Sequence, residues 1–170
     1  MNLLKTRRKY QETIGEFISA FAEVELYVTI FDSIIQTENT TNPTLVGSFH
    51  LPFTIKLNHI NDFIEKLNNN FLCEGWQFLR QEINDVYLNR NHIVHGTGTS
   101  SYWGENIRTI LDEGIKKSKG IELSIKTFSV NDIHNMSQRT YHILTGEYGI
   151  QGVFLQEFRL ISRSYFSKTT

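Results

Sequence analysis

The sequence between residues 14 and 35 reads IGEFISAFAEVELYVTIFDSII. Its apolar residues recur at steps of three and four, which is the period of an amphipathic helix. Further apolar residues widen that stripe around the cylinder, so the helix is expected to be central in the fold or shared with a partner chain. Continued outward, the pattern predicts a first helix from about Lys9 to Thr37.

The rest of the chain carries mostly helical patterns. Further helices are expected at about residues 53–67, 75–95, 129–144 and 151–165, with Ser129 as the N-cap of the fourth helix and Gly96 as the left-handed cap that ends the third. Two alternating segments near residues 107–111 and 121–128 flank a polar turn and predict a β-hairpin with one face in and one face out. The expected fold class is therefore mainly all-α: one domain over residues 1–170, built as a bundle of four to five helices with a small β-hairpin inserted near 107–128.

Composition limits the classes of function. A chain of 170 residues with 39% hydrophobic residues can bury one substantial core. Its lone cysteine, Cys73, has no intrachain partner, which argues against a disulfide scaffold and fits the cytoplasm. Secretion and membrane insertion are disfavoured, because no apolar run is long enough for either. With 17 Lys plus Arg against 18 Asp plus Glu there is no global basic field, so any nucleic-acid chemistry must be local.

The third helix ends in RNHIVHG, residues 90–96. Arg90 falls on the apolar stripe, so either its stem lies along the core with its head in water, or it is held in a crevice to bind a phosphate. Asn91 and His95 lie roughly 40° apart around the helix, whereas Arg90 is roughly 140° from His95. The Arg and His of one chain are therefore not expected to converge. His95 itself is either a helix cap or a proton shuttle.

Two acids interrupt the apolar face of the first helix. Glu25 and Asp32 need cations or solvent there, because an unpaired charge is costly to bury. Glu25 is expected near Arg90 or His95, where it would orient one of them. Glu23, roughly 160° away around the helix, is the competing candidate. The alternative is that this face is the edge of an interface and both acids are solvated.

The hexapeptide and its place at a helix end resemble a known family. Arg90-Asn91, three residues and then His95-Gly96 resemble the RxxxxH motif of the HEPN superfamily in its RNxxxH form, and the acid inside the apolar first helix looks like the same plan. The resemblance implies a helical bundle over about residues 9–95 and 129–165. It also implies a ribonuclease-type toxin or phage-defence protein. One departure is Thr97, which stands where a subgroup of HEPN toxins carries the Tyr that an antitoxin adenylylates.

What the resemblance implies chemically is metal-independent RNA cleavage at a composite site in a homodimer, without a cofactor. His95 would act as general base or acid and Arg90 would stabilise charge on the phosphate, while Asn91 positions His95 or the RNA backbone; the product would be a 2′,3′-cyclic phosphate. Two motifs meeting across a two-fold axis would supply His from one chain and Arg from the other. The implied partners are RNA, a second copy, and an antitoxin or defence-system protein.

Other residues carry weaker signals. Tyr102 and Trp103 either stack on splayed RNA bases or anchor a loop to the core. His92 is either structural or a secondary RNA contact. The remaining histidines are His50, His59, His134 and His142. They show none of the spacings typical of metal sites, so no dedicated metal is expected. Two noncatalytic functions stay open, a HEPN module that binds a nucleotide, RNA or another protein, and a plain helical adaptor.

Overall fold

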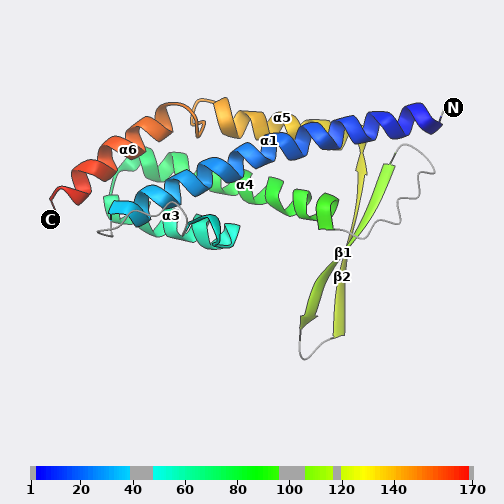
Figure 1. The fold of residues 1–170 in the computed structure, drawn as a ribbon, viewed down its shortest axis with the longest axis horizontal. Helices are drawn as coiled ribbons and strands as arrows, with labels where there is room; N and C mark the ends of the chain where they lie inside the picture. Colours follow the sequence, from blue (N-terminus) through cyan, green and yellow to red (C-terminus); the bar gives the residue numbers. More distant parts are fainter. Residues whose placement is uncertain (1–2, 39–47, 96–105, 117–119, 169–170) are drawn as a thin grey trace. The chain divides into compact units, whose positions relative to one another are not determined.

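The computed structural model describes residues 3–38, 48–95, 106–116 and 120–168, and these ranges are mostly helical (Figure 1). Their main elements are α1 (Leu3–Glu38), α3 (Phe53–Leu67), α4 (Asn70–His95), β1 (Asn106–Lys116), β2 (Gly120–Ser129), α5 (Val130–Thr145) and α6 (Val153–Phe166). The mainly all-α fold class is thereby confirmed, and so is a β-hairpin between the third and fourth predicted helices. Within the described ranges, no helix combines the length and the apolar character needed to cross a membrane.

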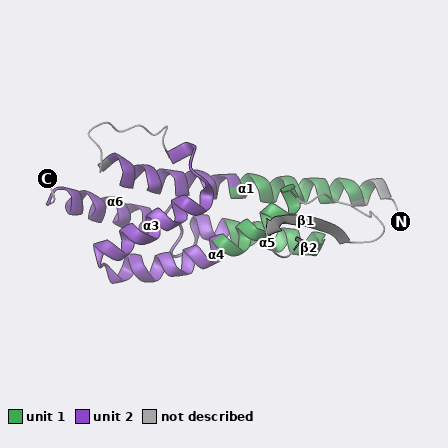
Figure 2. Ribbon diagram, turned by 90° about the horizontal axis from the view of Figure 1, so that it is seen from below, with its two compact units in different colours: residues 1–21, 84–140 green, residues 22–83, 141–170 purple. Residues whose placement is uncertain are grey.

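The chain divides into two compact units (Figure 2). Unit 1 comprises residues 1–21 and 84–140, and unit 2 comprises residues 22–83 and 141–170. Helices α1, α4 and α5 contribute residues to both units. The single domain over residues 1–170 stays a prediction.

Aromatic side chains form the core of unit 2. Phe31 of α1 meets Phe158 of α6 edge to face, with ring centroids 4.8 Å apart. Phe63 of α3 stacks on Phe166 of α6 at 5.3 Å. All four rings are buried, and such pairs add to the stability that burial of apolar surface already gives. The apolar stripe that predicted the first helix therefore does face a packed core.

The connection between α3 and α4 explains why α4 begins earlier than predicted. Asn68 ends α3 in the left-handed conformation, with φ 50°. The side-chain Oδ1 of Asn69 then accepts a hydrogen bond from the backbone N–H of Leu72 at 3.0 Å, which caps a helix starting at Asn70. The predicted start near Gly75 is wrong. A Cβ at Gly75 would lie 3.1 Å from the Phe154 ring, so this glycine marks close packing within a helix.

The hairpin in unit 1 has longer strands than predicted. Its antiparallel register pairs Ile110 with Ile125 and contains an irregularity between Asp112 and Ile115, inside the segment predicted as the turn. Lys126 Nζ donates to Asn89 Oδ1 of α4 at 2.9 Å, and Phe128 is buried, whereas Ile125 is 50% exposed. At the described positions, the buried face of β2 is therefore the one that carries Lys126 and Phe128.

Helix α5 begins with the N-cap that the sequence predicts. The backbone N–H of Asp132 donates to Ser129 Oγ at 3.0 Å, and the backbone N–H of Ser129 donates to Asp132 Oδ2 at 2.7 Å. This reciprocal pair is a capping box. The Ser129 backbone hydrogen bond, followed by the Ser129 side-chain hydrogen bond, lowers the pKa of Asp132 below its usual 3.8.

Replacing Ser129 by alanine should lower the free energy of unfolding by about 1 kcal/mol, because α5 loses its cap.

The folded-state pKa of Asp132 is depressed, so the contribution of its carboxylate to stability is present above pH 3.8. That contribution is lost as the pH falls through the folded-state pKa. The stability difference between wild type and Asp132→Asn should therefore shrink as the solution is acidified below 3.8. Urea unfolding at a series of pH values measures both effects. A difference that stays constant with pH would contradict the assignment.

Candidate functional site

The C-terminal turns of α4, in unit 1, position the three motif residues. Tyr87 stacks on Phe21 of α1 with ring centroids 6.2 Å apart. One turn further along α4, the guanidinium carbon of Arg90 lies 6.0 Å from the centroid of the same Phe21 ring. That distance is at the outer limit of a cation–π contact. Arg90 is half-buried, as expected of a long side chain that runs along a packed surface with its charged head toward water.

The head of Arg90 contacts both of the other motif residues. Its Nη1 donates to Asn91 Oδ1 at 3.2 Å and lies 3.1 Å from His95 Nε2. The expectation that the Arg and His of one chain do not converge is therefore wrong. Angles around a helix give only the directions in which side chains leave it. The long Arg90 side chain closes the remaining gap to the next turn, where His95 lies.

These contacts fix the proton on His95. A guanidinium has only hydrogen-bond donors, so Nε2 of His95 must be the acceptor. A neutral imidazole in this arrangement carries its proton on Nδ1. The Nη1 nitrogen has two hydrogens, and Asn91 Oδ1 and His95 Nε2 accept one each. His95 is exposed, so the site lies open to a ligand from solution.

The other predicted site residues fall in different parts of the chain. Glu25 belongs to unit 2 and is half-buried, and Glu23, in the same unit, is exposed and accepts from Gln151 Nε2 at 3.3 Å. The role of either acid at Arg90 or His95 stays a prediction. His92 is only 3% exposed, which favours the structural alternative over an RNA contact. The other predicted positions lie outside the described residues: Gly96, Thr97, Tyr102 and Trp103.

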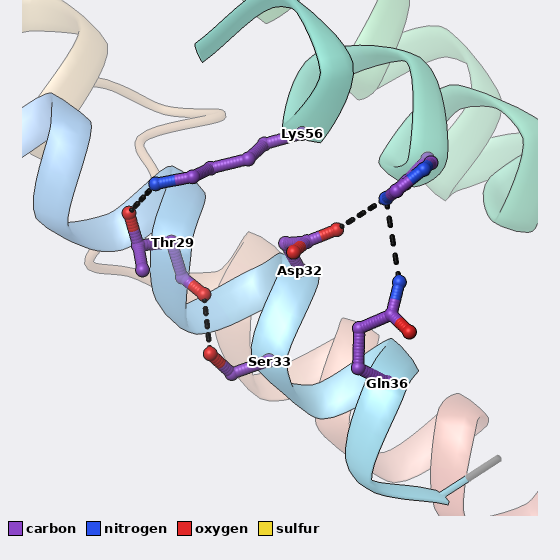
Figure 3. A network of polar contacts seen from close by, with 6 residues as sticks. Thr29, Asp32, Ser33, Gln36 and Lys56 are labelled. Atoms are coloured by element: carbon purple, nitrogen blue, oxygen red, sulfur yellow. Dashed lines mark hydrogen bonds and ion pairs between the residues drawn. The ribbon is translucent and has the colours of Figure 1, made fainter. Parts of the chain in front are cut away.

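A second polar cluster, in unit 2, joins α1 to α3 (Figure 3). Asp32 is fully buried, and its Oδ1 lies 2.8 Å from Nδ1 of His59, whose side chain is 36% exposed. Gln36 Nε2 lies 3.3 Å from the same ring nitrogen. Beside this pair, buried Lys56 donates from Nζ to Thr29 Oγ1 at 2.8 Å.

This cluster answers one question that the sequence raised. An acid on the apolar face of α1 was expected to need a cation or solvent, and Asp32 has His59. Its other oxygen, Oδ2, is buried and has no hydrogen-bond partner among the described residues. Sequence reasoning missed His59 and Lys56. The available signal was their spacing of three residues on α3, which places both side chains on one side of that helix.

Within the described residues, no group of three His, Cys, Asp or Glu side chains is arranged to hold a metal ion. Comparisons of the chain with protein-family models, with curated proteins and with solved structures gave no significant match.

Proposed function

We propose that this chain is a metal-independent endoribonuclease of the HEPN type, with Arg90, Asn91 and His95 as its catalytic residues. The observation that supports the proposal most directly is the contact of Arg90 Nη1 with both Asn91 Oδ1 and His95 Nε2. It brings an anion-binding group and a titratable base together at an exposed helix end, as phosphate chemistry on RNA requires.

In the proposed reaction, His95 Nε2 takes the proton from the ribose 2′-hydroxyl, and the 2′-oxygen forms a bond to phosphorus. The bond from phosphorus to the 5′-oxygen breaks, and that oxygen receives a proton from an imidazolium. Arg90 stabilises the negative charge on the non-bridging oxygens, and Asn91 holds the guanidinium in place. The products are a 2′,3′-cyclic phosphate and a 5′-hydroxyl.

The proposed assembly is a homodimer that joins two copies of the motif, working in the cytoplasm as part of a toxin–antitoxin or phage-defence system. Because Arg90 and His95 already meet within one chain, the dimer rests on the family resemblance and on the symmetry such sites use. Light scattering at micromolar protein concentration tests it directly. A strictly monomeric protein that still cleaves RNA would contradict the composite site.

A noncatalytic module that binds a nucleotide or RNA phosphate is the second candidate. The observation in its favour is that Arg90 occupies the nitrogen that His95 would use as a base. The two candidates share an anion-binding Arg90 and differ in whether a covalent bond is broken.

Incubation of the wild-type protein with single-stranded RNA in EDTA separates them. The ribonuclease proposal expects fragments with 2′,3′-cyclic phosphate and 5′-hydroxyl ends, identified by end-group analysis. Arg139→Ala is the matched control for Arg90→Ala. Arg139 lies in the same unit as Arg90 and pairs with Asp85 rather than with His95. Intact RNA at high concentration of folded protein would favour the binding module.

A further inference from the structure

The contact between Arg90 and His95 holds the base nitrogen of the site in an occupied state. We propose that this contact is a phosphate-operated switch: a phosphate oxyanion that binds Arg90 withdraws the guanidinium from His95 Nε2 and frees that nitrogen as a base. The catalytic use of the freed nitrogen rests on the proposed function. The binding and release themselves do not.

The Nη1 nitrogen of Arg90 has two hydrogens and two acceptors beside it, the Asn91 amide oxygen and the His95 ring nitrogen. While Nε2 accepts from Arg90, it cannot also accept the proton of a ribose hydroxyl. The base nitrogen of His95 is therefore not available until the head of Arg90 moves away from it.

Phosphate is a stronger acceptor than the ring nitrogen it would displace. A hydrogen bond from a guanidinium to a phosphate oxygen joins two ionised groups, whereas the hydrogen bond to a neutral imidazole has a charge on the donor only. The planar guanidinium also matches a phosphate bidentately. The contact with His95 is exposed, so the hydrogen bond that phosphate displaces is a weak one.

The exchange needs little movement of the backbone. The guanidinium carbon of Arg90 lies 6.0 Å from the centroid of the Phe21 ring, on which Tyr87 also stacks. Rotation about the side-chain torsions of Arg90 moves its head between His95 and an incoming anion. The helix that carries both residues can keep its position.

The test uses the whole 170-residue chain with ¹⁵N-labelled histidine rings, at a pH where imidazoles are neutral. Long-range ¹H–¹⁵N spectra report which ring nitrogen of His95 carries the proton. In chloride, the wild type should favour the Nδ1–H tautomer. In Arg90→Ala the tautomer ratio should shift about fivefold toward Nε2–H, the effect of losing one modest hydrogen bond.

Inorganic phosphate at matched ionic strength should shift the wild-type ratio in the same direction and leave Arg90→Ala unchanged. His134, an exposed histidine on α5 in the same unit, provides the internal reference, and Arg139→Ala should behave as wild type. Arg90→Lys guards against misfolding of the alanine variant. A lysine keeps the charge without the forked donor, so its ratio in chloride should lie nearer that of the alanine variant.

The switch would be overturned by a wild-type tautomer ratio that does not change with phosphate, or by one that equals the Arg90→Ala ratio in chloride. Because the spectra need no RNA cleavage, the two proposals fail separately. A phosphate-responsive ratio without cleavage keeps the switch and rejects the ribonuclease. Cleavage with an unresponsive ratio rejects the switch and keeps the ribonuclease.

Discussion

Replacing His95 by alanine should slow RNA cleavage by about a hundredfold to ten-thousandfold, the range that a positioned general acid or base contributes. The protein should remain folded, because His95 is exposed and its truncation leaves no cavity in a core. Initial rates on single-stranded RNA in EDTA measure the loss. Circular dichroism and urea unfolding of the same preparation check the fold.

His134→Ala is the matched control for this experiment. His134 is also exposed and lies in the same unit, on α5, and no described contact joins it to Arg90 or His95. Its loss should leave the cleavage rate unchanged. If His95→Ala and Arg90→Ala both cleave at the wild-type rate, the motif is not the site of cleavage.

The second large effect is expected at the cluster between α1 and α3. Replacing His59 by alanine should lower the free energy of unfolding by about 2–3 kcal/mol, because the carboxylate of Asp32 would stay buried without its donor. The value lies below that of a fully buried ion pair because His59 is 36% exposed and water can replace part of the interaction.

A double variant separates the cost of the orphaned charge from that of the lost side chain. In the His59→Ala background, Asp32→Asn removes the charge and should recover part of the stability, which gives a favourable coupling in a double-mutant cycle. Urea unfolding of the four proteins supplies the numbers. A loss in His59→Ala no larger than that in His134→Ala would show that the pair contributes nothing.

Sequence patterns predicted the fold where local signals decide the structure. Helix α3 occupies Phe53–Leu67, as predicted, because Pro52 precedes the apolar stripe and Asn68 ends it in the left-handed conformation. Ser129 likewise announces α5 through a cap that acts over three residues. The start of α4 was missed because a glycine inside a helix looks like a boundary when the packing partner cannot be seen.

The candidate site, too, could be predicted only where local signals decide the structure. Arg90, Asn91 and His95 could be identified from spacing at a helix end, but their convergence could not, because residue angles around a helix ignore the reach of a long side chain. Asp32 could be recognised as an acid that needs a partner. The identity of His59 depends on how α1 and α3 dock, which no local pattern records.

Gly75 shows how close packing between helices limits the substitutions that a protein can accept. A methyl group there would meet the Phe154 ring at 3.1 Å and the Tyr148 ring at 3.2 Å, both closer than side chains normally pack. Both rings would have to shift before position 75 could carry a side chain. In evolutionary terms, a larger residue at position 75 fits best beside smaller residues at 148 and 154, so we expect the three positions to change together.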